Sequence, residues 1–271
     1  MDFNKKVKQN VANNFDQSIH VYQAFEAKHQ FFSTYALKLA ESIGITHGSS
    51  VLDVGCGYGL SAMVLNARYG CRVLGVDLSP QMIAAGRSLT KSEGICLVVG
   101  DGENLLPIVG KRQFDYVLFN ASIFIFPDSN KAIDEAFNCL FPGGKIAFSF
   151  YPHLLGGDEA DLFDIAFNRL AEPLPRYRVI TGYAKACKSL ADRCGNIRHH
   201  RWTRRLDLGF LQDFFSIPAQ SASLFPGRDY KQRSKMVKQL FATLKDMEGY
   251  ARIVWRMAEG TKASPKVSEN R

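Results

Sequence analysis

Short apolar segments rich in β-branched residues alternate with segments of helical spacing through the first part of this chain. Five segments have the strand pattern, and they lie at residues 50–55, 72–79, 94–101, 114–120 and 145–151. Apolar residues recur at helical spacing in the segments between them, at 60–70, 79–89 and 128–140. Strands and helices in this order predict parallel βαβ units, and therefore an open α/β sheet.

The chain on either side of this region predicts a helical cap and two further strands. Two short, aromatic-rich helices are expected before residue 40, helices at 158–172 and 229–247, and strands at 196–208 and 250–258. We therefore predict a Rossmann-like α/β fold with a seven-stranded, mostly parallel sheet, helices on both faces and an N-terminal helical cap. Residues 1–45 are predicted to form a helical cap or lid, and residues 46–152 the core of the fold. Residues 153–260 are predicted to complete the sheet, and residues 261–271 to form a polar tail.

Composition narrows the class of protein. The chain is 46% hydrophobic and 22% charged, which is typical of a globular protein. No stretch is long and apolar enough for a membrane span, and the N-terminus lacks the apolar segment of a secretory signal. The six cysteines form no CxxC pair. Cys187 and Cys194 are too far apart for a zinc-binding pair, and His199 and His200 are adjacent rather than three to five residues apart. These features favour a cytoplasmic protein with reduced thiols and no metal site.

The positive charge is concentrated in the second part of the chain. The 13 basic residues of 1–150 are balanced by 13 acidic ones, so the whole net charge of +8 lies in 151–271. The densest basic run is Ile197 to Arg205. Basic side chains protect the edge of a sheet, and this is the favoured interpretation. The alternative is attraction of an anionic substrate or an acidic partner.

Three glycines at alternate positions follow the first strand. Gly55, Gly57 and Gly59 lead into a helix, an arrangement that brings backbone N–H groups close to a ligand. Asp77 ends the second strand, where a carboxylate binds the hydroxyls of a ribose. The turn is not GxGxxG, because residue 60 is Leu, and the acidic Asp53 inside the strand is unlike a dinucleotide fingerprint. The amino group of a bound amino-acid moiety is a suitable partner for that buried carboxylate.

Five successive motifs resemble those of the class I S-adenosylmethionine-dependent methyltransferases. They are VLDVGCGYG, GVDLSPQMI, GDGENLLP, FDYVLFN and LFPGGKIAF, and together they cover about residues 48–150. The resemblance implies S-adenosylmethionine as the cofactor. It assigns the methionine part of this cofactor to Asp53 and the loop of Gly55, Gly57 and Gly59, the ribose to Asp77, the adenine ring to Leu78 and Met82, the adenine edge to Asp101, Gly102 and Glu103, and the vicinity of the sulfonium to Asn120.

Two groups within this class share further features with the chain. Lys8-Gln9, Phe15 and Tyr22 resemble the start of the malonyl-acyl-carrier-protein O-methyltransferases of biotin synthesis, whereas residues 221–240 look more like quinone-methylating enzymes. The resemblance implies methyl transfer to a small-molecule acceptor, with an anionic acceptor favoured by the basic excess. A malonyl-carrier-protein acceptor is the alternative, and a non-catalytic cofactor-binding module is the alternative of another class.

Candidate catalytic residues are few. His153, just after the fifth strand, is predicted as a general base, and Tyr22 is predicted to orient the substrate. The C-terminal part is expected to supply helices on the substrate side. Nucleic acid is an unfavoured partner, because Trp202 alone stands among the basic residues and the sequence after Asn120 lacks the Asn-Pro-Pro-aromatic motif of base-amino methylating enzymes.

Overall fold

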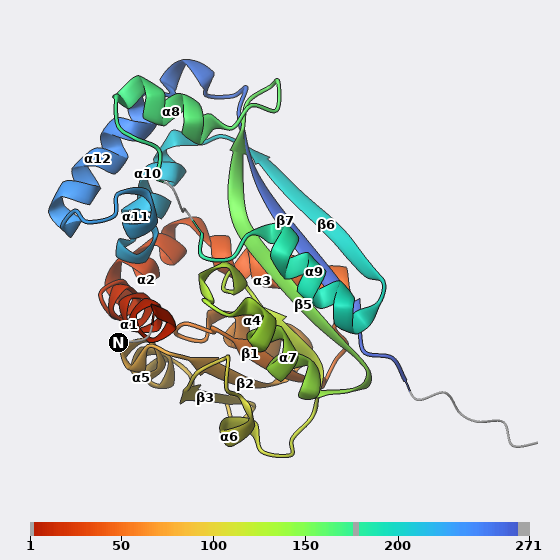
Figure 1. The fold of residues 1–271 in the computed structure, drawn as a ribbon. Coiled ribbons are helices and arrows are strands. Elements are labelled where there is room, and N and C mark those ends of the chain that lie inside the picture. Colours follow the sequence, from red (N-terminus) through yellow and green to blue (C-terminus); the bar gives the residue numbers. More distant parts are fainter. Residues whose placement is uncertain (1–2, 176–178, 265–271) are drawn as a thin grey trace, which may run out of the picture.

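A seven-stranded sheet runs through the molecule in the spatial order β3-β2-β1-β4-β5-β7-β6 (Figure 1). The computed structural model describes residues 3–175 and 179–264. The strands are β1 (Ser50–Val54), β2 (Arg72–Asp77), β3 (Ile95–Val99), β4 (Phe114–Phe119), β5 (Leu140–Leu155), β6 (Ile197–Arg205) and β7 (Arg252–Thr261). β1 to β5 are parallel, and β7 is antiparallel to both β5 and β6. The predicted α/β fold with a seven-stranded, mostly parallel sheet is confirmed.

Helices cover both faces of this sheet, which is why its central strands are almost entirely apolar. The helices are α1 (Phe3–Asp16), α2 (Ile19–His29), α3 (Phe31–Ile43), α4 (Leu60–Tyr69), α5 (Pro80–Leu89), α6 (Leu106–Val109), α7 (Ser129–Asn138), α8 (Leu162–Leu170), α9 (Tyr183–Cys194), α10 (Leu208–Ser216), α11 (Pro218–Leu224) and α12 (Tyr230–Ala242), with 3₁₀ turns η1 (Ile123–Ile125) and η2 (Lys245–Met247). α3 packs beside α4, and α7 packs beside α9. α8, α10, α11 and α12 gather beyond the upper end of the sheet (Figure 1).

The N-terminal region contains three helices rather than the two short ones that we predicted. α2 ends at Gln30, whose backbone is left-handed with φ 44°. The buried carboxylate of Glu26 then accepts hydrogen bonds from the backbone N–H groups of Phe32 and Ser33, so it caps α3. The apolar spacing continues through this break, which is why the sequence did not reveal it. α3 buries Tyr35 and Leu39 and contacts β5 and α4, so it belongs to the layer of helices that covers the sheet.

The sheet extends further than the sequence pattern indicates at its fifth strand. β5 begins at Leu140 instead of Lys145, and its register with β4 shifts between Phe114 and Tyr116. The Pro-Gly-Gly segment before Lys145 is therefore absorbed as an irregularity at the start of the strand. β7 runs to Thr261, and the polar tail beyond residue 264 lies outside the described residues.

The basic segment forms the edge strand β6, as the favoured interpretation predicted. Arg201 faces Arg256 and Arg205 faces Arg252 across the ladder to β7. Trp202 points to the opposite face and contacts the ring of Tyr35 in α3. No helix within residues 3–175 and 179–264 is both long and apolar enough to cross a membrane.

Candidate active site

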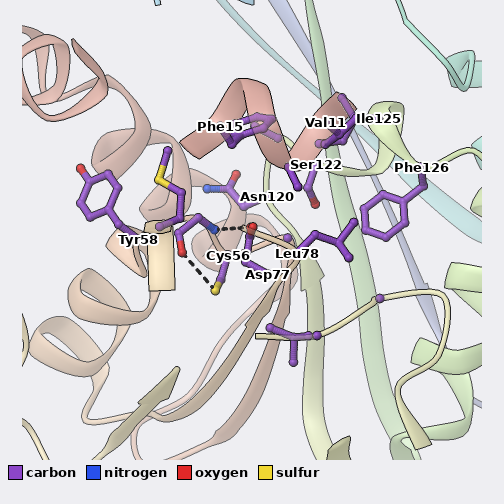
Figure 2. A pocket seen from close by; sticks show the side chains of 18 of the residues that line it. Val11, Phe15, Cys56, Tyr58, Asp77, Leu78, Asn120, Ser122, Ile125 and Phe126 are labelled. Carbon is purple, nitrogen blue, oxygen red and sulfur yellow. Dashed lines mark hydrogen bonds between the residues drawn. The ribbon is translucent and has the colours of Figure 1, made fainter. Parts of the chain in front are cut away.

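A cavity of about 80 Å³ lies at the carboxyl ends of β1, β2 and β4. The glycine loop after β1 and the ends of β2 and β4 form its floor, and helices α1 and α2 cover it. Figure 2 shows Val11 and Phe15 of α1 above Asn120 and Ser122, with Asp77 below them. Ligands of open α/β sheets bind at this end of the strands, so the geometry brings most of the predicted site residues to one place.

Glycine is required at the three positions of the loop for different structural reasons. All three have positive φ, at 76° for Gly55, 56° for Gly57 and 81° for Gly59. A Cβ at Gly55 would lie 2.6 Å from the Cβ of Ser122, and one at Gly59 would lie 2.8 Å from Leu97, so these positions are required by packing. A Cβ at Gly57 would meet nothing within 4 Å, because this glycine faces the cavity. The backbone at Gly57 is therefore open to the cavity, as a close ligand contact would require.

Asp53 is a buried carboxylate without a partner. It is 1% exposed, and neither of its carboxylate oxygens has a hydrogen-bond partner among the residues that the structure describes. Burial, with a smaller contribution from the negative charge of Asp77, raises the pKa of Asp53 to about 7. A buried group of this kind calls for a donor from outside the chain, and an ammonium group meets that requirement.

Asp77 is held in place by backbone donors. Its two oxygens accept hydrogen bonds from the N–H groups of Gly57, at 2.7 Å, and Ser79, at 2.9 Å. Burial raises the pKa of Asp77, and these two hydrogen bonds oppose that effect. Because a carboxylate can accept about four hydrogen bonds, Asp77 retains capacity toward the cavity.

The predicted adenine-edge residues form an ion-pair cluster with α1. The Nζ of Lys8 lies 2.7 Å from the Oδ2 of Asp101 and 2.6 Å from the Oε2 of Glu103. Glu103 is 3% exposed, and its other oxygen accepts a hydrogen bond from the backbone N–H of Asp128. Asp101 and Gly102 line the cavity, whereas Glu103 lies behind them. The sequence could not show that α1 reaches this loop.

The remaining predicted cofactor residues lie on two walls of the same cavity. Leu78 and Met82 are apolar and line it beside Asp77. Asn120 is fixed from both sides, since its amide donates to the Oγ of Ser61 and its carbonyl accepts from the Oγ of Ser149. Sequence reasoning did not identify these two serines, because their contact with Asn120 spans 59 and 29 residues. A side chain held in this way presents a rigid surface to a ligand.

The wall opposite the glycine loop is apolar and aromatic. The side chain of Tyr22 lines it and stacks on Phe32 with ring centroids 4.6 Å apart. Burial and the nearby Tyr58, Glu26 and Asp77 raise the pKa of Tyr22, so its phenol is a neutral hydrogen-bond donor. The further apolar residues of the lining come from α1 and from the segment after β4, and they are Val11, Ala12, Phe15, Ile125 and Phe126.

His153 lies in a different part of the molecule. β5 continues past Tyr151 to Leu155, and His153 lines a separate cavity of about 90 Å³ with Phe150 and Phe163. The structure therefore does not bring His153 together with Gly57, Asp77 and Asn120. Tyr22 is the predicted catalytic residue that does line the first cavity.

Comparison with known proteins places the core in a family. Residues 52–148 match the family model described as a methyltransferase domain. These residues form a class I methyltransferase domain. The match contains the glycine loop, Asp77, Asp101 and Asn120, which confirms the resemblance drawn from the five motifs. It leaves α1 and α2 outside, so Phe15 and Tyr22 of the aromatic wall lie beyond the matched residues, whereas Phe126 lies within them.

Two curated relatives align with the domain and with some of the sequence next to it. The chain is 32% identical over 147 residues to the aklanonic acid methyltransferase DauC of Streptomyces sp. (strain C5), which covers 52% of this chain and 65% of that protein. It is 31% identical over 144 residues to the demethylmenaquinone methyltransferase of Staphylococcus aureus (strain JH9), which covers 52% of this chain and 57% of the relative. The chain thus spans less than two thirds of the length of either relative.

The whole fold also resembles a solved structure. The [4+2]-cyclase SpnF superposes with a TM-score of 0.62 at 16% identity, over 95% of this chain and 97% of that one. At this identity the likeness concerns the fold alone. It places the methyltransferase domain and its flanking helices in one shared architecture.

Proposed function

We propose that this protein transfers the methyl group of S-adenosylmethionine to a small, planar, largely apolar acceptor of the quinone or polyketide kind. One observation carries the proposal. The open backbone at Gly57, the fixed carboxylate of Asp77 and the rigid amide of Asn120 converge on one cavity whose opposite wall is aromatic. The first three match the polar parts of the cofactor, and the aromatic wall matches the acceptor.

The residues present fit the cofactor. Asp53, two residues before the glycine loop and outside the cavity lining, supplies the buried negative charge that an ammonium group requires. The backbone of that loop is open to the cavity at Gly57. Asp77 accepts hydrogen bonds from ribose hydroxyls, while Leu78 and Met82 provide an apolar surface for the adenine ring. When bound, S-adenosylmethionine supplies an electrophilic methyl group on its sulfonium.

The chain's own contribution is to hold the acceptor and to exclude water. Tyr22 donates a hydrogen bond to an acceptor oxygen as a neutral phenol, because its raised pKa prevents it from acting as a base near neutral pH. Phe15 and Phe32 provide flat apolar contacts for a planar acceptor. Alignment of two reactants in this way is a large source of rate enhancement. No role for His153 is required in this arrangement.

The lining favours an apolar acceptor over a strongly anionic one. Lys8 is the basic residue of the cavity lining that the structure describes, and its charge is already engaged by Asp101 and Glu103. The basic excess lies mainly elsewhere, along β6 and β7. The curated relatives are named for aklanonic acid and demethylmenaquinone, which agrees with a planar acceptor.

A labelling experiment tests this proposal. The purified protein is incubated with methyl-labelled S-adenosylmethionine and, in separate arms, with hydroxyquinones, a malonyl-carrier protein and RNA, and Asp77→Ala serves as the matched inactive control. We expect label in the hydroxyquinone fraction that depends on Asp77. Label confined to the carrier protein would support the malonyl alternative, and label in RNA would contradict both. Calorimetric binding of S-adenosylhomocysteine without labelling in any arm would identify a non-catalytic module.

A further inference from the structure

Helix α1 covers the cofactor cavity but is not itself a buried helix. None of its residues is buried, yet Lys8, Val11, Ala12 and Phe15 line the cavity. α1 contacts α5 on one side of the cavity and α11 on the other (Figure 1). A helix with so little buried surface gains little from apolar packing, so specific polar contacts must determine where it rests.

Polar contacts hold α1 at two points. In the middle of the helix, Lys8 is paired with Asp101 and Glu103, at 2.7 and 2.6 Å. At the last residue, Asp16 accepts hydrogen bonds from the hydroxyl of Ser79 and from the backbone N–H of Gln81, at 3.3 Å for the latter. Both contact points lie just after strand ends at the same edge of the sheet, since Asp101 follows β3 and Ser79 follows β2.

The contact at Lys8 joins groups of opposite charge, whereas Asp16 accepts hydrogen bonds from uncharged donors. Burial lowers the pKa of Lys8, but the hydrogen bonds and negative charges of Asp101 and Glu103 outweigh burial, so its pKa lies above the ordinary 10.5. Lys8 is 21% exposed and Glu103 is 3% exposed, so water screens this pair only in part. We call Lys8, Asp101 and Glu103 the Lys8 cluster.

Helix α1 forms the roof of the cofactor cavity. Lys8, Val11, Ala12 and Phe15 of this helix contribute to the lining, across from the glycine loop and Asp77. A cofactor that enters or leaves through this roof displaces α1, and the Lys8 cluster must separate when α1 moves.

We propose that Lys8 is a positioning residue that controls exchange of the cofactor. This inference rests on the proposed function, because it takes the cavity to bind S-adenosylmethionine. Lys8 fixes the carboxylate of Asp101, the residue predicted at the adenine edge, and at the same time holds α1 over the cavity. One ion-pair cluster thus couples closure of the roof to the orientation of a cofactor contact. As a tether on the roof, the cluster should resist opening to a similar extent with and without the cofactor, so its loss is expected to change both exchange rates.

A tether that resists opening to a similar extent with and without ligand should slow ligand association and ligand dissociation alike. Replacing Lys8 with Met removes the charge and keeps the length of the side chain. We expect S-adenosylhomocysteine to associate and dissociate about tenfold faster in Lys8→Met, the lower end for loss of a hydrogen bond to a charged group. The ratio of the two rate constants should change much less than either one. Lys8→Arg restores slow exchange, and Lys6→Met is the control because Lys6 is exposed on the same helix.

The measurement is release of labelled S-adenosylhomocysteine into an excess of unlabelled ligand, with association followed by stopped flow. In about 1 M salt, where the screening length falls to about 3 Å, exchange should accelerate in the wild-type protein and change little in Lys8→Met. If Lys8→Met lowers the melting temperature while both rates stay at wild-type values, Lys8 is merely structural and the inference is overturned. If the wild-type protein binds no S-adenosylhomocysteine at all, the proposed function fails first.

Discussion

Asp53 offers the most quantitative test of the site. Its pKa of about 7 in the folded protein compares with an ordinary value of 3.8. A shift of this size corresponds to about 4 kcal/mol, since one pKa unit is about 1.4 kcal/mol. Asp53 is 1% exposed, so solvent screening does not reduce this figure appreciably. Replacing Asp53 with Asn keeps the shape of the side chain and removes the charge.

The sign of the pH dependence follows from the raised pKa. The folded protein holds a proton on Asp53 more tightly than the unfolded chain does. The stability that this provides is fully present below about pH 4 and is lost as the pH rises to about 7. We therefore expect the free energy of unfolding of the wild-type protein to fall relative to Asp53→Asn by about 3 kcal/mol between pH 5 and pH 7.5.

Urea denaturation of both proteins at several pH values measures this difference, and other titrating groups cancel in it. The same raised pKa predicts ligand linkage, because an ammonium group beside Asp53 favours its ionised form. The affinity for S-adenosylhomocysteine should rise by up to about tenfold per pH unit between pH 5 and 6.5 and then level off, whereas Asp53→Asn should show no such rise. A stability difference that does not vary with pH would refute the reasoning.

Four further variants separate ligand binding from stability. Gly57→Ala and Gly48→Ala both place a Cβ in open space at positive φ, so each should lower the free energy of unfolding by about 1 to 2 kcal/mol in urea denaturation. Only Gly57→Ala should abolish calorimetric binding of S-adenosylhomocysteine. Equal loss of binding in both variants would contradict the cavity assignment. Asp77→Ala should weaken that binding by about 1.5 to 3 kcal/mol, and an unchanged dissociation constant would exclude Asp77 from the site. Arg204→Met removes the guanidinium 3.6 Å from the ring of Phe210 and should lower stability by about 1 kcal/mol without affecting binding, as a combined urea and calorimetry series would show.

The sequence predicted those parts of the fold that depend on local pattern. β1 to β5 carry the β-branched runs that are typical of strands buried on both faces. Because the carboxyl ends of parallel strands lie at one edge of a sheet, the residues at these strand ends can be assigned to that edge from the strand order alone. Asp77 and Asn120 could therefore be assigned to one edge of the sheet before the structure was known. The same pattern predicted β6 and β7, although their order in the sheet depends on long-range packing.

What the sequence could not show depends on contacts between distant segments. The pairing of Lys8 with Asp101 spans 93 residues, and nothing in the N-terminal helix alone indicates it. His153 was expected at the site because the fifth strand seemed to end at residue 151, but pairing with β7 continues that strand to Leu155. α9, α10 and α11 were not predicted at all. α10 carries the run Phe214-Phe215 and few polar residues, since it packs within an aromatic cluster with Phe25 and Phe31.

The arginines of β6 also bear on how copies of this molecule meet. Arg201 and Arg205 stand opposite Arg256 and Arg252, and Glu159 pairs with two of these four arginines, Arg201 and Arg252, so the open edge of the sheet keeps a net positive charge. A strand from a neighbouring copy would bring the same charges alongside, and repulsion would oppose the new ladder. We therefore expect this edge to disfavour strand pairing between identical molecules, and light scattering of concentrated protein at low and high salt measures whether screening of these charges permits association.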